Sequence, residues 1–149
     1  MTGLKIKTPF LEMQWNPKDA DKIAAWQLYI ELLTRISTQP LSNTDGDEQT
    51  ALSSIYSLFS TTREVIKQNG HDCLEFTKIA IIVLNQIIRP FTAKWHKLSL
   101  QGAFDDPAMC SQFRSELAIL QRSLKNYTGM LGQMAGVEED LTELQREDA

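Results

Sequence analysis

The amino-acid sequence predicts an all-α protein: an antiparallel four-helix bundle with a kinked third helix, an extended N-terminal arm and a short acidic C-terminal tail. Three observations support this class. Apolar residues recur at three- and four-residue spacing over long stretches; helix-capping patterns precede several of these stretches; and Gly and Pro are scarce, at 7 and 5 of 149 residues. The length suits a single domain. We expect the arm at 1–15, the helical domain at 16–136 and the tail at 137–149.

Residues 1–15 alternate loosely between apolar and polar positions, which predicts an extended arm containing at most one short strand. The first helix is expected to begin at the favoured N-cap Asn16, with Pro17 in the first helical position. It should end near Thr38, because Pro40 disfavours helix before it. We expect its core-facing stripe to consist of Ile23, Trp26, Ile30, Leu33 and Ile36.

The second helix is expected over about Asp47–Gln68, after a polar loop at Leu41–Glu48 that is rich in turn residues. Asn69 and Gly70 then form a C-cap pair that ends the helix. The residues of its apolar stripe are Leu52, Ile55, Tyr56, Phe59, Val65 and Ile66.

The third helix is the most apolar part of the chain. Asp72 and Glu75 form a capping-box pattern ahead of it. From Phe76 to Ile88 the apolar residues occupy every helical face, which predicts a buried hub helix in preference to a long buried strand. Asn85 would then be a buried amide, and leaving it without a partner would cost about 1–3 kcal/mol. Pro90 predicts a kink, after which helical spacing resumes.

The last helix is expected to begin at Asp106 and Pro107 and to end at Gly136. Its apolar residues alternate between spacings of four and three over three heptads, as they do in a coiled coil. We regard this seam as a candidate interaction surface. It consists of Phe113, Leu117, Leu120, Leu124, Tyr127, Leu131 and Met134.

The net charge of −4 is unevenly distributed along the chain. The tail at 137–149 holds six of the nineteen acids but only one of the fifteen bases, so the body is close to neutral. Residues 76–104 contain no acid at all, and this segment is compatible with a nucleic-acid partner. The candidate residues for binding an anion or a partner there are Lys78, Arg89, Lys94, Trp95 and Lys97.

Several classes of protein are disfavoured by what the sequence lacks. The N-terminus has no apolar signal region, and the longest apolar run, Ile79–Leu84, is far shorter than the roughly 18–20 residues of a membrane span. Cys73 and Cys110 suggest neither a disulfide framework nor a metal-ligand spacing, and no glycine-rich phosphate loop is present. We therefore expect a cytoplasmic protein with no membrane contact, metal or cofactor.

Arg89 and His96 form the one pair with catalytic potential. They stand seven residues apart, so a regular helix presents them on one face. An arginine binds phosphate through its planar fork and a histidine transfers protons near neutral pH, which together suit RNA cleavage. The pair resembles the Rx4–6H signature of the HEPN superfamily, which implies an all-α, often dimeric ribonuclease. The resemblance covers two residues, and Pro90 stands where that superfamily usually has a polar residue.

The first functional hypothesis is a non-enzymatic helical module for protein–protein interaction, either a homo-oligomer or a small accessory subunit of a larger complex. It follows from the heptad seam and from the lack of converging polar residues. The alternatives are a HEPN-like ribonuclease using Arg89 and His96, and a helical nucleic-acid-binding subunit using residues 76–104. The enzyme hypothesis requires Arg89 and His96 to be exposed in one cleft, with Trp95 expected in the core.

Overall fold

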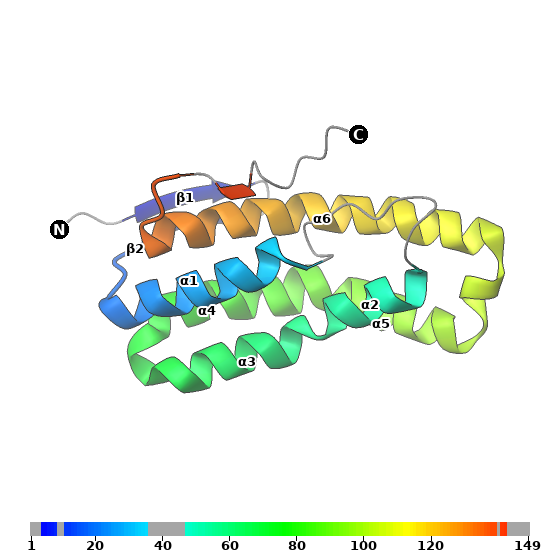
Figure 1. Ribbon diagram of the computed structural model, residues 1–149, viewed down its shortest axis with the longest axis horizontal. Coiled ribbons are helices and arrows are strands. Elements are labelled where there is room, and N and C mark those ends of the chain that lie inside the picture. Colours follow the sequence, from blue (N-terminus) through cyan, green and yellow to red (C-terminus); the bar gives the residue numbers. More distant parts are fainter. Residues whose placement is uncertain (1–3, 9–10, 36–46, 140, 143–149) are drawn as a thin grey trace.

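A computed structural model describes residues 4–8, 11–35, 47–139 and 141–142 (Figure 1). Helices dominate it, so the predicted all-α class is confirmed. The α-helices are α1 (Asp19–Leu33), α2 (Glu48–Tyr56), α3 (Leu58–Asn69), α4 (Leu74–Ile82), α5 (Arg89–Leu100) and α6 (Pro107–Ala135). Shorter helical segments are η1 (Gly70–Cys73), the π-helical η2 (Val83–Ile88) and η3 (Ala103–Asp105).

The N-terminal arm forms a two-stranded hairpin. Strands β1 (Leu4–Thr8) and β2 (Leu11–Trp15) pair antiparallel, with Leu4 opposite Trp15 and Thr8 opposite Leu11. The second half of the arm therefore supplies the partner edge that a single strand would lack. β1 lies against α6 (Figure 1).

The start of α1 differs from the prediction. Its N-cap is Lys18, and Pro17 lies before the helix instead of inside it. The backbone N–H of Lys18 donates to the Asp21 carboxylate at 2.8 Å. Asp21, inside the helix, therefore supplies the acceptor at this end of α1 that was expected from the side chain of Asn16. α1 ends at Leu33; the predicted end near Thr38 and the loop residues 41–46 lie outside the described residues.

The predicted core stripe of α1 is wrong in part, and its last member, Ile36, lies outside the described residues. The side chains that α1 buries are Ala24, Ala25, Leu28, Tyr29 and Leu32, together with Asp21. Ile23 and Trp26 are instead 52% and 45% exposed, and Ile30 and Leu33 are half-buried. The two alanines allow α1 to approach its neighbours closely, so the smaller apolar face is the one that packs.

The expected second helix is two helices that meet at Ser57, which ends α2 and begins α3. Asp47 caps α2 by accepting the backbone N–H of Thr50 at 2.7 Å. Gly70 ends α3 with φ 72°, which confirms the predicted Asn69–Gly70 stop. The stripe is largely buried as expected, but Tyr56 is 59% exposed.

The predicted cap of the third helix is wrong as well. Cys73 is the N-cap of α4, whereas Asp72 lies in the 3₁₀ turn η1. The first turn of α4 is served from another element: the buried Asp21 of α1 accepts the backbone N–H of Phe76 at 3.0 Å. A long-range carboxylate has thus taken the place of the expected local cap.

The hub helix has two faces, contrary to the prediction of burial all round. Phe76, Ile79 and Val83 are buried, but Ile81 is 48% exposed and Asn85 is exposed as well. Just before Pro90, where the kink is expected, the helix passes through the π-helical turn η2, and Pro90 is the second residue of α5. The wider turn accommodates a residue that has no N–H to donate.

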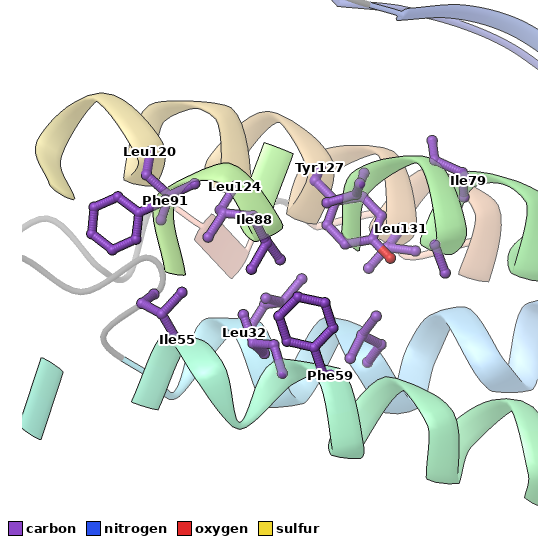
Figure 2. Close-up of a cluster of buried hydrophobic side chains, with 14 of the residues drawn as sticks. Leu32, Ile55, Phe59, Ile79, Ile88, Phe91, Leu120, Leu124, Tyr127 and Leu131 are labelled. Atoms are coloured by element: carbon purple, nitrogen blue, oxygen red, sulfur yellow. The ribbon is translucent and has the colours of Figure 1, made fainter. Parts of the chain in front are cut away.

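α6 runs the length of the molecule and begins and ends as predicted, with Asp106 as N-cap and a left-handed Gly136 as C-cap. All seven residues of its heptad seam are buried, and several of them appear in the core cluster of Figure 2. A Cβ at Gly132 would lie 2.9 Å from the Tyr29 ring, so this glycine permits the close contact between α6 and α1. The grouping of the helices into a four-helix bundle stays a prediction.

Candidate functional site

The segment Arg89–Lys97, where the sequence concentrates basic and aromatic residues, forms most of α5. Its residues divide between two environments. Trp95 faces the core and is 0% exposed, as expected, whereas Arg89 and His96 are exposed. The two sides of this helix therefore need separate descriptions.

The core-facing side is tied to Glu116 of α6. The Glu116 carboxylate accepts the Lys94 ammonium at 2.7 Å and the Trp95 indole N–H at 3.0 Å. Gln112 donates to the same carboxylate at 3.0 Å. Burial by itself would raise the pKa of Glu116, but these three donors outweigh it and hold the pKa below its usual range. Lys94 is thus neutralised, and Trp95 is satisfied within the protein.

The other two lysines of the acid-free segment, residues 76–104, differ in whether an acid lies within reach of them. Lys78 pairs with Glu75 at 2.8 Å, from just outside that segment. Lys97 is exposed on α5. Residues 76–104 lack acids in sequence, but acids on either side of the segment reach two of its bases. The remaining positive charge on this side of the protein gathers around Arg89.

Arg89 and His96 line one shallow hollow of about 190 Å³, which we call the basic hollow. The sequence predicted that the two share a helical face, and the structure brings them together. Residues from α2 and α3 complete the walls. The lining residues are Tyr56, Phe59, Arg63, Arg89, Thr92, Ala93 and His96. None of these residues is acidic, so the described walls carry only neutral or basic side chains.

Contacts at two points orient the Arg89 guanidinium. Its Nε and Nη2 donate to the Asn85 Oδ1 at 3.2 and 3.1 Å. Its Cζ lies 4.7 Å from the centroid of the Phe59 ring, in a cation–π contact. Asn85, expected to be a buried amide in the core, is therefore an exposed residue that positions Arg89.

Arg63 is the residue of this hollow that sequence reasoning missed. It lies on α3, 26 positions before Arg89, and is exposed. No spacing rule connects residues on two different helices, so only the packing of α3 against its neighbours reveals the pair. Tyr56 was likewise assigned to the core, but its ring stands at the rim, 5.7 Å from that of Phe59.

A second surface lies along the outside of α1. Ile23, Trp26 and Ile30 form what we call the α1 stripe, and the last two line a hollow of about 500 Å³ between α1 and α3. Glu31 forms an ion pair with Arg35 at 2.6 Å. Arg35 also donates to Thr61 at 3.1 Å, which ties the end of α1 to α3. An apolar stripe beside a polar rim is typical of a contact surface.

The heptad seam of α6 packs inside its own chain, so any partner surface must lie elsewhere. Cys73 is buried and free, and Cys110 is half-buried and free. Within the described ranges, no three His, Cys, Asp or Glu side chains gather as metal ligands would. No helix in the same ranges is both long and apolar enough to cross a membrane.

Comparison of the chain with protein-family models, with curated proteins and with solved structures finds no match. The functional argument therefore rests on the two surfaces just described, the α1 stripe and the basic hollow.

Proposed function

We propose that this chain is a non-enzymatic helical interaction module of the cytoplasm, an antiparallel four-helix bundle that self-associates through the α1 stripe. One observation carries the proposal. Two large apolar side chains of α1 point away from the core, with Ile23 52% and Trp26 45% exposed. Burying them against a second copy would remove this apolar surface from water.

The arrangement of residues on α1 is self-complementary. Two copies of a helix that pack antiparallel about a two-fold axis face each other through residues placed symmetrically about one point. An axis between Trp26 and Gln27 sets Ile23 opposite Ile30 of the second copy. The same axis sets the exposed Lys22 opposite Glu31. The axis therefore pairs the two isoleucines with each other, sets Trp26 opposite Gln27, and sets Lys22 opposite Glu31, which also binds Arg35 of its own chain.

The energetics favour association only if most of the stripe is covered. Full burial of a large apolar side chain contributes about 1.5–3 kcal/mol, and a symmetric dimer supplies each residue of the stripe twice. Association costs at least about 4 kcal/mol in lost translational and rotational freedom. Because Ile23 and Trp26 are about half exposed in the monomer, each gains only about half of that amount on association, so the dimer should dissociate on dilution.

The mass of the full chain, measured by light scattering, tests this proposal. We expect a value near twice the monomer mass of 16.9 kDa at tens of micromolar protein. Trp26→Lys should give the monomer mass, because a charge is placed beside the axis. Leu100→Lys is the matched control, because it adds the same charge at a side chain that is 76% exposed on α5. This control should remain dimeric.

A charge swap tests the register. Lys22→Glu should weaken the dimer by placing like charges opposite each other, and Lys22→Glu combined with Glu31→Lys should restore it. A wild-type chain that stays monomeric over this concentration range would contradict self-association. Equal loss of dimer in Leu100→Lys and Trp26→Lys would contradict the assignment to α1.

The HEPN-like ribonuclease is the second candidate, and one observation favours it: Arg89 and His96 are exposed and line the same hollow. Cleavage of single-stranded RNA that is lost in His96→Ala and Arg89→Ala, and kept in Arg122→Gln, would support it. A nucleic-acid-binding role for the whole segment 76–104 is less favoured, because Lys78 and Lys94 are already paired with acids.

A further inference from the structure

We infer that the basic hollow is a binding site for a phosphate ester joined to a planar base, that is, for a nucleoside monophosphate unit. The inference concerns binding alone and rests neither on self-association nor on RNA cleavage. It depends on the convergence of Arg63, Arg89 and His96 from two helices onto one recess.

The charge of the hollow indicates an anion. Two guanidinium groups and an imidazole line a recess of about 190 Å³, and no acid is among the lining residues. By contrast, Lys78, Lys94 and Arg114 each form an ion pair with a carboxylate of the protein. In the described part of the chain, Arg63 and Arg89 have no such ion-pair partner. An external anion can supply the missing charge.

The orientation of Arg89 indicates a phosphate in particular. Asn85 and the Phe59 ring fix its guanidinium plane, so the entropy cost of ordering a long side chain is already met before a ligand arrives. A planar guanidinium with free N–H groups matches the geometry of phosphate oxygens, and a second arginine opposite it strengthens the field. The volume of the recess suits the phosphate group and excludes a whole nucleotide.

The aromatic rim indicates what the phosphate is attached to. The Tyr56 ring is 59% exposed and belongs to the wall of the same recess. A base attached to the bound phosphate would lie outside the recess against this ring, and base–aromatic stacking contributes about as much as one good hydrogen bond per base. Arginine, histidine and an exposed ring at one site thus fit a phosphate and a base together.

Titration of the ¹⁵N-labelled full chain, followed by NMR, tests the site with AMP, inorganic phosphate and adenosine as probes. AMP should shift the His96 imidazole and the backbone amides of Arg63 and Arg89, with weaker shifts for phosphate and the weakest for adenosine. Added salt should weaken the binding of AMP. An oligoadenylate with a 5′-phosphate distinguishes the ends of RNA from free nucleotides as the source, because neighbouring nucleotides add affinity only in the first case.

Variants locate the binding. Arg63→Gln and Arg89→Gln should each weaken AMP about tenfold or more, as expected for the loss of a charge-assisted contact. Tyr56→Ala should weaken AMP but leave inorganic phosphate unchanged. Arg122→Gln, which removes an exposed guanidinium from α6, is the matched control and should bind as wild type does.

Three results would overturn the inference: no shift at His96 with millimolar AMP, adenosine binding as tightly as AMP, or equal weakening by Arg122→Gln and Arg89→Gln. Because the readout is a chemical shift, neither a monomeric chain nor the absence of RNA cleavage affects it.

Discussion

The two sides of α5 carry similar residues and serve different purposes. On one side Lys94 and Trp95 donate to Glu116, and the tryptophan is completely buried. On the other side Arg89 and His96 line an open recess with Arg63, and the contacts of Arg89 there are with Asn85 and Phe59, which are both neutral. Where Glu116 of the same chain binds the basic and aromatic residues of α5, these residues stabilise the fold. Where no acid of the described chain binds them, they form a candidate binding site.

The largest expected effect separates two neighbours in sequence. Trp95→Ala should lower the free energy of unfolding by about 3–5 kcal/mol, because it empties a core position and removes one of the three donors to Glu116. His96→Ala should change it by less than about 0.5 kcal/mol, as exposed positions do. Urea unfolding of both variants measures the difference. Similar losses in the two would mean that α5 does not have a buried side and a free side.

The second-largest effect on stability is expected from removal of the Glu116 carboxylate. Glu116→Ala leaves the indole N–H of Trp95 without its partner, which should cost about 1–3 kcal/mol. The pKa of Glu116 is held below its ordinary value, so its ionised form stabilises the fold above the ordinary pKa of 4.5. This contribution should be lost as the pH falls through the lowered folded-state pKa.

The pH dependence therefore sharpens the comparison. The difference in unfolding free energy between wild type and Glu116→Ala should shrink as the pH is lowered below about 4. Glu116→Gln keeps an acceptor for Trp95 and has no proton to lose. Its free energy of unfolding should therefore lie between those of wild type and Glu116→Ala and should depend less on pH. A difference between wild type and Glu116→Ala that stays constant from pH 7 to pH 3 would contradict the assigned role of this carboxylate.

The smallest effect on stability is expected on the open side. Arg89→Ala removes an exposed cation–π contact, worth about 0.5–1 kcal/mol, and its hydrogen bonds to Asn85. Thermal unfolding should therefore change by only a few degrees. A loss of stability as large as that of Trp95→Ala would show that Arg89 holds the fold together. It would contradict the proposal that the Arg89 guanidinium is oriented for binding a ligand.

The sequence predicts some features of the fold well because they depend on local chemistry. The heptad seam of α6, the cap at Asp106 and the stop at Gly70 each follow from a few neighbouring residues. The core face of α1 was not predictable in this way. Its apolar residues fit two overlapping stripes, and hydropathy favours the one with Trp26 while packing selects the one with Ala24 and Ala25.

The candidate site shows the same limit. The sequence places Arg89 and His96 on one helical face, and this pairing is present in the structure. Arg63 and Tyr56 could not be assigned to the site, because they lie on other helices and reach it only through tertiary packing. Asn85 was misjudged for a related reason: its neighbours are apolar, but the exposed Ile81 shows that this helix has a solvent face.

The most direct test of the contrast between the two sides of α5 is the free energy of unfolding in urea with and without AMP, for wild type, Arg89→Gln and Arg122→Gln. At an AMP concentration tenfold above its dissociation constant, wild type and Arg122→Gln should each gain about 1.4 kcal/mol. Arg89→Gln should gain about 0.4 kcal/mol or less, as a dissociation constant raised at least tenfold implies. Equal gains in all three proteins, or no gain in wild type, would contradict the assignment of the open side of α5 as a binding site.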